Sequence, residues 1–212
     1  MLTTALAERA PGMGEESQAS TPEGDAVRAN TYSLLASLLA APPGSGLLAV
    51  LESMEPVRDA DGQAMAPAWE ALRLTGARAS PEGLDDEYHA LFIGVGRGEL
   101  VPYGSWYMTG FMMDRPLAAL RRDLAELGFE RQEDVTEPED HVAALLETMG
   151  MIVGAGESIA AQRRFFASHM EPWLKTFFVD LRDAPSARFY RAVAALGEQF
   201  VDFEQQYLNM VV

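Results

Sequence analysis

The 212-residue sequence contains no cysteine, a single lysine, Lys175, and three histidines. The absence of cysteine excludes disulfides, thiolate zinc sites and cysteine nucleophiles. No glycine-rich segment precedes Lys175, so Lys175-Thr176 cannot be the end of a phosphate-binding P-loop. These absences leave few residues from which a catalytic centre could be assembled.

Long apolar runs are missing as well. The run at 34–41 is stopped by Pro42-Pro43-Gly44, well short of the ~18 residues that a transmembrane helix needs. No basic segment precedes the short apolar patch near the first residue, so this patch does not have the pattern of a secretory signal. We expect a soluble, cytoplasmic protein without stable membrane insertion.

Positive charge is scarce, because 16 Lys+Arg stand against 32 Asp+Glu and give a net charge of −16. This balance argues against binding to nucleic acid or to an anionic membrane surface, both of which require clustered positive charge. It would attract a basic peptide and speed its association. Net charge also keeps proteins soluble, so the charge alone does not establish a basic partner.

Apolar residues recur at helical spacing through most of the chain, and no alternating pattern of useful length predicts a strand. The fold prediction is an all-α, single-domain bundle of about eight helices. Helices are predicted over 24–41, 47–54, 63–79, 80–94, 108–128, 138–167 with a break at Gly156, and 171–182. Residues 94–98 and 102–107 are predicted to be loop. The clearest pattern comes last and predicts a core-facing seam of Phe189, Val193, Leu196, Phe200, Phe203 and Tyr207.

Three segments have predictions of their own. Residues 1–22 have little apolar surface to bury and are predicted to be a flexible tail ahead of one domain at 23–212. The charged segment 129–136 is the predicted hinge. Met108, Met112 and Met113 are predicted to fill the core, which is the more common use of methionine.

The sequence Glu137-Pro138-Glu139-Asp140-His141 is predicted to begin a helix, because proline and acidic residues favour the first helical turn. Asp140 and His141 precede the apolar stripe of that helix, so we expect both to be partly exposed at its rim. They could bind a polar partner there. Alternatively, Asp140 only caps the helix and His141 only hydrogen-bonds a neighbouring loop.

Four short elements resemble, in order and spacing, the TorD/DmsD/NarJ family of redox-enzyme maturation chaperones. They are Y-x-x-L-F at 88–92, P-Y-x-S-x-Y at 102–107, E-P-x-D-H at 137–141 and F-x-x-H-x-x-P-W at 166–173. The resemblance implies a cytoplasmic all-α chaperone rather than an enzyme. Its partners would be the apoprotein of a molybdopterin oxidoreductase and the twin-arginine signal peptide of that apoprotein, with the chaperone acting as a monomer or homodimer.

The resemblance also implies a peptide-binding site, in which an apolar groove takes the hydrophobic stretch and rim carboxylates take the arginines. His169, Pro172 and Trp173 match a pattern that is more structural. Tyr103, Trp106 and Tyr107 could either wall the groove or cover the core. The residues carried over to the site are Tyr88, Leu91, Phe92, Pro102, Tyr103, Ser105, Tyr107, Glu137, Pro138, Asp140 and His141.

Two further possibilities concern cofactors. Some family members bind guanine nucleotide weakly, although no phosphate loop here supports this, and we expect no cofactor. The alternative function is a metal-dependent helical enzyme that uses His141, Asp140 and Glu137. Bundle metal sites need Glu-x-x-His on two helices, whereas this chain has only a single Asp86-x-x-His89 with that spacing.

Overall fold

The structure is a computed structural model that describes residues 23–55, 65–130 and 137–210. Within these ranges it contains ten α-helices, one π-helical turn and no strand, which confirms the all-α prediction. The predicted tail at 1–22 and most of the predicted hinge lie outside the described residues. No helix in the described ranges has the length and apolar character needed to cross a membrane.

The described chain divides into two compact units, each of which is described by itself. The first unit combines residues up to Ala40 with 103–173, and the second combines 41–102 with 174–210. Each unit therefore brings together segments that are far apart in the sequence.

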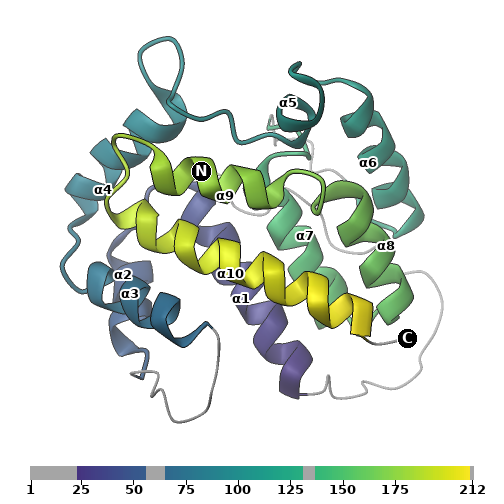
Figure 1. Cartoon of the computed structure of the whole chain (residues 1–212), viewed down its shortest axis with the longest axis horizontal. Helices are drawn as coiled ribbons and strands as arrows, with labels where there is room; N and C mark the ends of the chain where they lie inside the picture. Colours follow the sequence, from purple (N-terminus) through teal and green to yellow (C-terminus); the bar gives the residue numbers. More distant parts are fainter. Residues whose placement is uncertain (1–22, 56–64, 131–136, 211–212) are drawn as a thin grey trace. The chain divides into compact units, whose positions relative to one another are not determined.

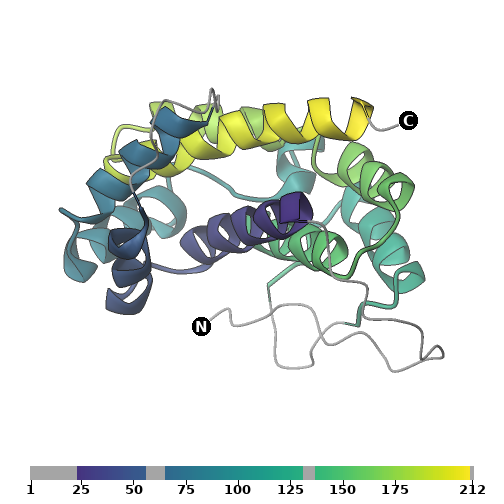
Figure 2. The same ribbon diagram turned by 90° about the horizontal axis from the view of Figure 1, so that it is seen from below.

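The first unit is built on α1 (Glu23–Ala40) and α7 (Val142–Gly154), which lie side by side (Figure 1 and Figure 2). A Cβ at Gly150 would lie 3.2 Å from the Cβ of Tyr32, so the glycine allows the two helices to approach closely. In α1, Tyr32, Leu35, Leu38 and Leu39 are buried, whereas Val27 is exposed.

The rest of the first unit contains α5 (Gly104–Thr109), α6 (Arg115–Glu126) and α8 (Ile159–His169). Residues 102–107 were predicted as loop, and 108–128 as one helix. Both predictions are wrong, because Gly110 ends α5 in the left-handed conformation (φ 78°) and the Asp114 carboxylate accepts the N–H of Arg115 to begin a new helix.

The second unit contains α2 (Ser45–Ser53), α3 (Ala66–Gly76), α4 (Pro81–Tyr88), a π-helical turn η2 (His89–Ile93), α9 (Leu174–Asp183) and α10 (Phe189–Met210). The predicted helix start at 80–82 is confirmed, since the Ser80 hydroxyl accepts the N–H of Gly83. Gly94 ends η2 with φ 60°, and a Cβ there would meet the carbonyl oxygen of Arg97.

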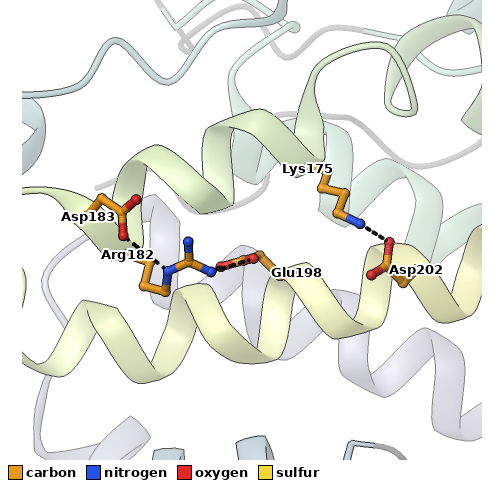
Figure 3. A network of polar contacts seen from close by, with 5 residues as sticks. All are labelled: Lys175, Arg182, Asp183, Glu198 and Asp202. Atoms are coloured by element: carbon orange, nitrogen blue, oxygen red, sulfur yellow. Dashed lines mark hydrogen bonds and ion pairs between the residues drawn. The ribbon is translucent and has the colours of Figure 1, made fainter.

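Helices α9 and α10 lie side by side in the second unit (Figure 1). Gly197 lies directly against the ring of Phe178, and Phe200 is fully buried. Along the exposed side, Nη1 of Arg182 donates to both carboxylate oxygens of Glu198, and Lys175 pairs with Asp202 at 2.5 Å (Figure 3). Such exposed pairs add little stability, so the buried seam holds these helices together.

The predicted seam of α10 is confirmed for its first four residues and wrong for Phe203. Phe189, Val193, Leu196 and Phe200 are buried, whereas Phe203 is 38 % exposed and Tyr207 is half-buried. The ring of Phe203 instead stacks between those of Phe200 and Tyr207 on the helix surface. Heptad spacing gives the direction of an apolar stripe but not how far the neighbouring helices cover it.

The start of α10 is capped by a side chain from α4. One oxygen of Glu87 accepts the N–H groups of Arg188 and Tyr190 at 2.7 and 2.9 Å, and the other accepts that of Phe189. We expect Glu87→Gln to lower the free energy of unfolding by ~1–2 kcal/mol, because these are charge-assisted bonds to unpaired helix N–H groups.

Urea unfolding tests this expectation. The matched control is Asp86→Asn, which removes the neighbouring charge from an exposed position on the same helix. If both variants lose the same free energy of unfolding, the effect comes from removing a negative charge and not from losing the cap.

Candidate functional site

The P-Y-x-S and E-P-x-D-H elements meet in the first unit. Tyr103 and His141 form an isolated antiparallel bridge, and the N–H of Gly104 donates to the carbonyl of Asp140 at 2.9 Å. The N–H of Ser105 donates to Oδ2 of the Asp140 carboxylate at 2.8 Å. Asp140 therefore holds the first turn of α5 with both its backbone and its side chain.

This arrangement corrects the predicted role of the motif. The helix begins at Val142, and not at Pro138, so Asp140 does not cap it. His141 is the N-cap, and its Nδ1 accepts the N–H of Ala143 at 3.2 Å. Asp140 and His141 are 3 % and 5 % exposed, so the expectation that they are partly exposed is wrong. The bridge to Tyr103 draws both residues inside.

Burial sets the charge state of the site. It lowers the pKa of His141 to about 4, so the ring is neutral near pH 7 and can accept the cap hydrogen bond. Burial, and then the nearby Asp140, raise the pKa of Glu137. The Tyr103 hydroxyl donates to the Glu137 carboxylate in a very short contact. The tyrosine ring also packs edge-on against the His141 ring.

One polar atom of the site has no partner. Oδ1 of Asp140 is buried without a hydrogen bond among the described residues. A buried acceptor without a donor lowers stability, so this atom is a candidate for contact with a bound group. Glu139, by contrast, is already engaged, since one of its oxygens accepts two N–H groups of Arg121 at 2.8 and 3.0 Å.

The F-x-x-H-x-x-P-W element packs against the start of α5. The indole N–H of Trp173 donates to the carbonyl of His169 at 2.8 Å, and a Cβ at Gly104 would lie 3.1 Å from that indole nitrogen. The ring of Tyr107 packs against Trp173. His169 bonds Asp123 of α6 at 2.6 Å. These contacts agree with a structural role for the element.

The Y-x-x-L-F element belongs to the second unit. Tyr88 and Phe92 pack against the ring of Tyr190 at the start of α10, and Leu91 is fully buried. Burial raises the pKa of Tyr190 far above its ordinary value. Pro102, the last residue of that unit in this part of the chain, is buried too.

The predicted site residues thus fall into two groups, with Tyr88, Leu91, Phe92 and Pro102 in the second unit and the others in the first. All of them are buried or half-buried. The four half-buried residues, which offer the most surface to a ligand, are Phe92, Tyr103, Tyr107 and Glu137.

The sequence reasoning missed a surface beside this site. Met108, Met112 and Met113 were predicted to fill the core, but the structure exposes all three, together with Phe111. Gly110 was the sequence signal for this exposed segment. It ends α5 and leaves too few residues for another helical turn before Asp114 begins α6.

The site has the character of a helical binding protein. In the parts of the chain that the structure describes, no group of three or more His, Asp or Glu side chains is placed to hold a metal ion. Sequence comparison matches residues 58–179 to the family described as nitrate reductase delta subunit. The chain belongs to this family of maturation chaperones, the TorD/DmsD/NarJ family.

Individual relatives agree. The chain is 31% identical to the chaperone protein TorD of Ferrimonas balearica over 86% of this chain and 90% of that protein. It is 29% identical to TorD of Shewanella loihica over 93% and 100%, and 28% identical to TorD of Vibrio atlanticus over 59% and 64%. These relatives are named as chaperones and not as enzymes.

A solved structure has the same fold. A crystal structure from Archaeoglobus fulgidus, described as a candidate redox enzyme maturation protein, superposes with a TM-score of 0.53 at 17% identity. The superposition covers 91% of this chain and 99% of that one. It supports the helical architecture across both units.

Proposed function

We propose that this protein is a cytoplasmic maturation chaperone that binds the twin-arginine signal peptide and the apoprotein of a molybdopterin oxidoreductase. It would assist cofactor insertion and delay export until the client is mature. Family membership and the TorD relatives support a chaperone of this kind. The net charge of −16 suits a client segment that carries arginines.

The observation that carries the proposal is the pair of carboxylates at the start of α7. Glu137 is half-buried and accepts a hydrogen bond from the Tyr103 hydroxyl, and Asp140 has one buried oxygen without a donor among the described residues. An arginine of the peptide would contact Glu137 first. If it displaces the Tyr103 hydroxyl, a second guanidinium N–H could supply the missing donor to Asp140. Two-pronged guanidinium contacts of this type are strong.

The test is a titration of the full chain with a synthetic twin-arginine signal peptide. We expect Glu137→Gln to weaken binding about ten- to a hundredfold, because a lost charge-assisted hydrogen bond is worth ~1.5–3 kcal/mol. Affinity should also fall in acid as Glu137, whose pKa is raised, takes up a proton. Isothermal titration calorimetry measures both effects.

Two controls belong to this titration. Glu126→Gln removes an exposed carboxylate from α6 and should leave the affinity unchanged. A peptide with two lysines in place of the arginines should bind more weakly, because lysine cannot form the two-pronged contact. If Glu137→Gln melts normally and binds as tightly as the parent, these carboxylates are not the arginine site.

A further inference from the structure

The segment between α5 and α6 exposes apolar side chains that the fold could have buried. Phe111 is 71 % exposed and Met113 is 69 % exposed, and Met108 and Met112 lie beside them in the sequence with lower exposure. Contiguous exposed apolar residues in a soluble protein mark a site of interaction. We call residues 108–113, which include the last two residues of α5 and the segment that follows it, the apolar loop.

Three hydrogen bonds hold the apolar loop in place. The N–H of Met113 donates to the Ser105 hydroxyl at 3.2 Å, and Thr109 bonds the backbone of Phe111. Met113 has φ 56°, the left-handed conformation that side chains other than glycine rarely adopt. Ser105 is fully buried and is itself held by Asp140. The fold thus maintains a strained and exposed methionine, which is a cost that a binding role would explain.

A cavity of about 420 Å³ adjoins the apolar loop at the start of α6. Its lining combines apolar, basic and acidic side chains, namely Met113, Asp114, Arg115, Leu117, Ala118 and Arg121. The volume lies within the range of ligand-binding pockets and could receive apolar side chains of a partner.

The charge beside this cavity is positive, opposite to that of the whole chain. In the described parts of the chain, the side chains of Arg115 and Arg122 have no hydrogen-bond or ion-pair partner, and both are exposed. Asp114 is occupied as the cap of α6, and Arg121 is paired with Glu139. The start of α6 adds the positive end of a helix dipole. Two unpaired arginines against the single carboxylate of Asp114 make this surface favour a partner that carries carboxylates over one that carries arginines.

We propose that the apolar loop and the start of α6 form a second docking surface, which takes an amphipathic partner segment whose apolar side chains are flanked by Asp or Glu. Its apolar side chains enter the cavity beside Met113, and its carboxylates pair with Arg115 and Arg122. Methionines suit this role because their flexible side chains adapt to different apolar partners. The surface differs in charge from the carboxylate site, although the two share α5 as their support.

Fluorescence anisotropy with two designed helical peptides tests the proposal. Both carry the same leucine stripe, which is flanked by glutamates in one and by lysines in the other. We expect the full chain to bind the glutamate peptide at least tenfold more tightly. Met113→Ser and Arg115→Glu should each weaken that binding about tenfold or more. Arg115→Glu should also reduce the ratio of the affinity for the glutamate peptide to that for the lysine peptide.

Met210→Ser is the matched control, because it removes an exposed methionine, 73 % exposed, from the end of α10. It should leave glutamate-peptide binding unchanged. Equal binding of both peptides, or an equal effect of Met210→Ser, would overturn the proposal. So would a parent protein that is a dimer in sedimentation and becomes monomeric in Met113→Ser, because the occupant would then be a second copy. Twin-arginine peptide binding should be unaffected by Met113→Ser, which separates this test from that of the proposed function.

Discussion

Lowering the pH from 6.5 to about 4 should reduce the free energy of unfolding by roughly 3 kcal/mol through His141 alone. Burial lowers the pKa of this residue from 6.5 to about 4, so between these values the unfolded chain binds a proton that the folded chain does not. Stability attributable to His141 is fully present above pH 6.5 and is lost as the pH falls. Protonation would also remove the lone pair of Nδ1 that accepts the Ala143 N–H.

The variant His141→Asn isolates this effect. Asparagine is a strong N-cap residue and can accept the same N–H, but it does not titrate. Urea unfolding of both proteins at several pH values should show a steeper loss in the parent between pH 6.5 and 4. Glu137, whose pKa is raised, acts in the opposite sense and is present in both proteins, so the difference between them reports His141. Parallel pH profiles would show that His141 titrates normally.

The helical fold could be predicted from sequence because its signals are local. Apolar spacing and the Ser80 cap each act within a few residues, and the structure confirms the helical fold and the cap that they predict. Boundaries failed where another segment intervened. The helix predicted from Pro138 begins at Val142 instead, because Asp140 is bound to the start of α5, 35 residues earlier in the chain.

The site itself was predicted only as a set of residues. Family resemblance placed Ser105 and Asp140 in one site, and the structure shows a direct hydrogen bond between them. The resemblance did not reveal that Asp140 and His141 are buried, because their burial depends on the tertiary bridge to Tyr103. The exposure of Met113 was unpredictable for a related reason, since methionine patterns alone do not distinguish core from surface.

The contacts within the first unit give three of the four sequence elements a common physical role. Asp140 holds Ser105, Ser105 holds Met113, and Trp173 packs against Gly104 at the start of the same short helix. Alpha-helices as short as α5 are not stable alone, so the position of this helix depends on these outside contacts. A change at Trp173 should therefore affect the carboxylate site and the apolar loop together.

Trp173→Ala should lower the free energy of unfolding by ~3–5 kcal/mol, the usual cost of removing a fully buried large aromatic side chain. Trp173 is 2 % exposed, packs on Tyr107 and donates its indole N–H to the carbonyl of His169, which would lose this hydrogen bond. Trp173→Phe keeps most of the volume and loses mainly that hydrogen bond, so its loss should be smaller, ~1–2 kcal/mol. Urea unfolding with Trp69→Ala, a half-buried tryptophan in α3, provides the comparison.

In Trp173→Phe, which should remain folded, we expect weaker binding of the twin-arginine peptide and of the glutamate peptide alike, because both surfaces depend on α5. A loss for Trp173→Ala no larger than that of Trp69→Ala would show that the tryptophan does not support the site.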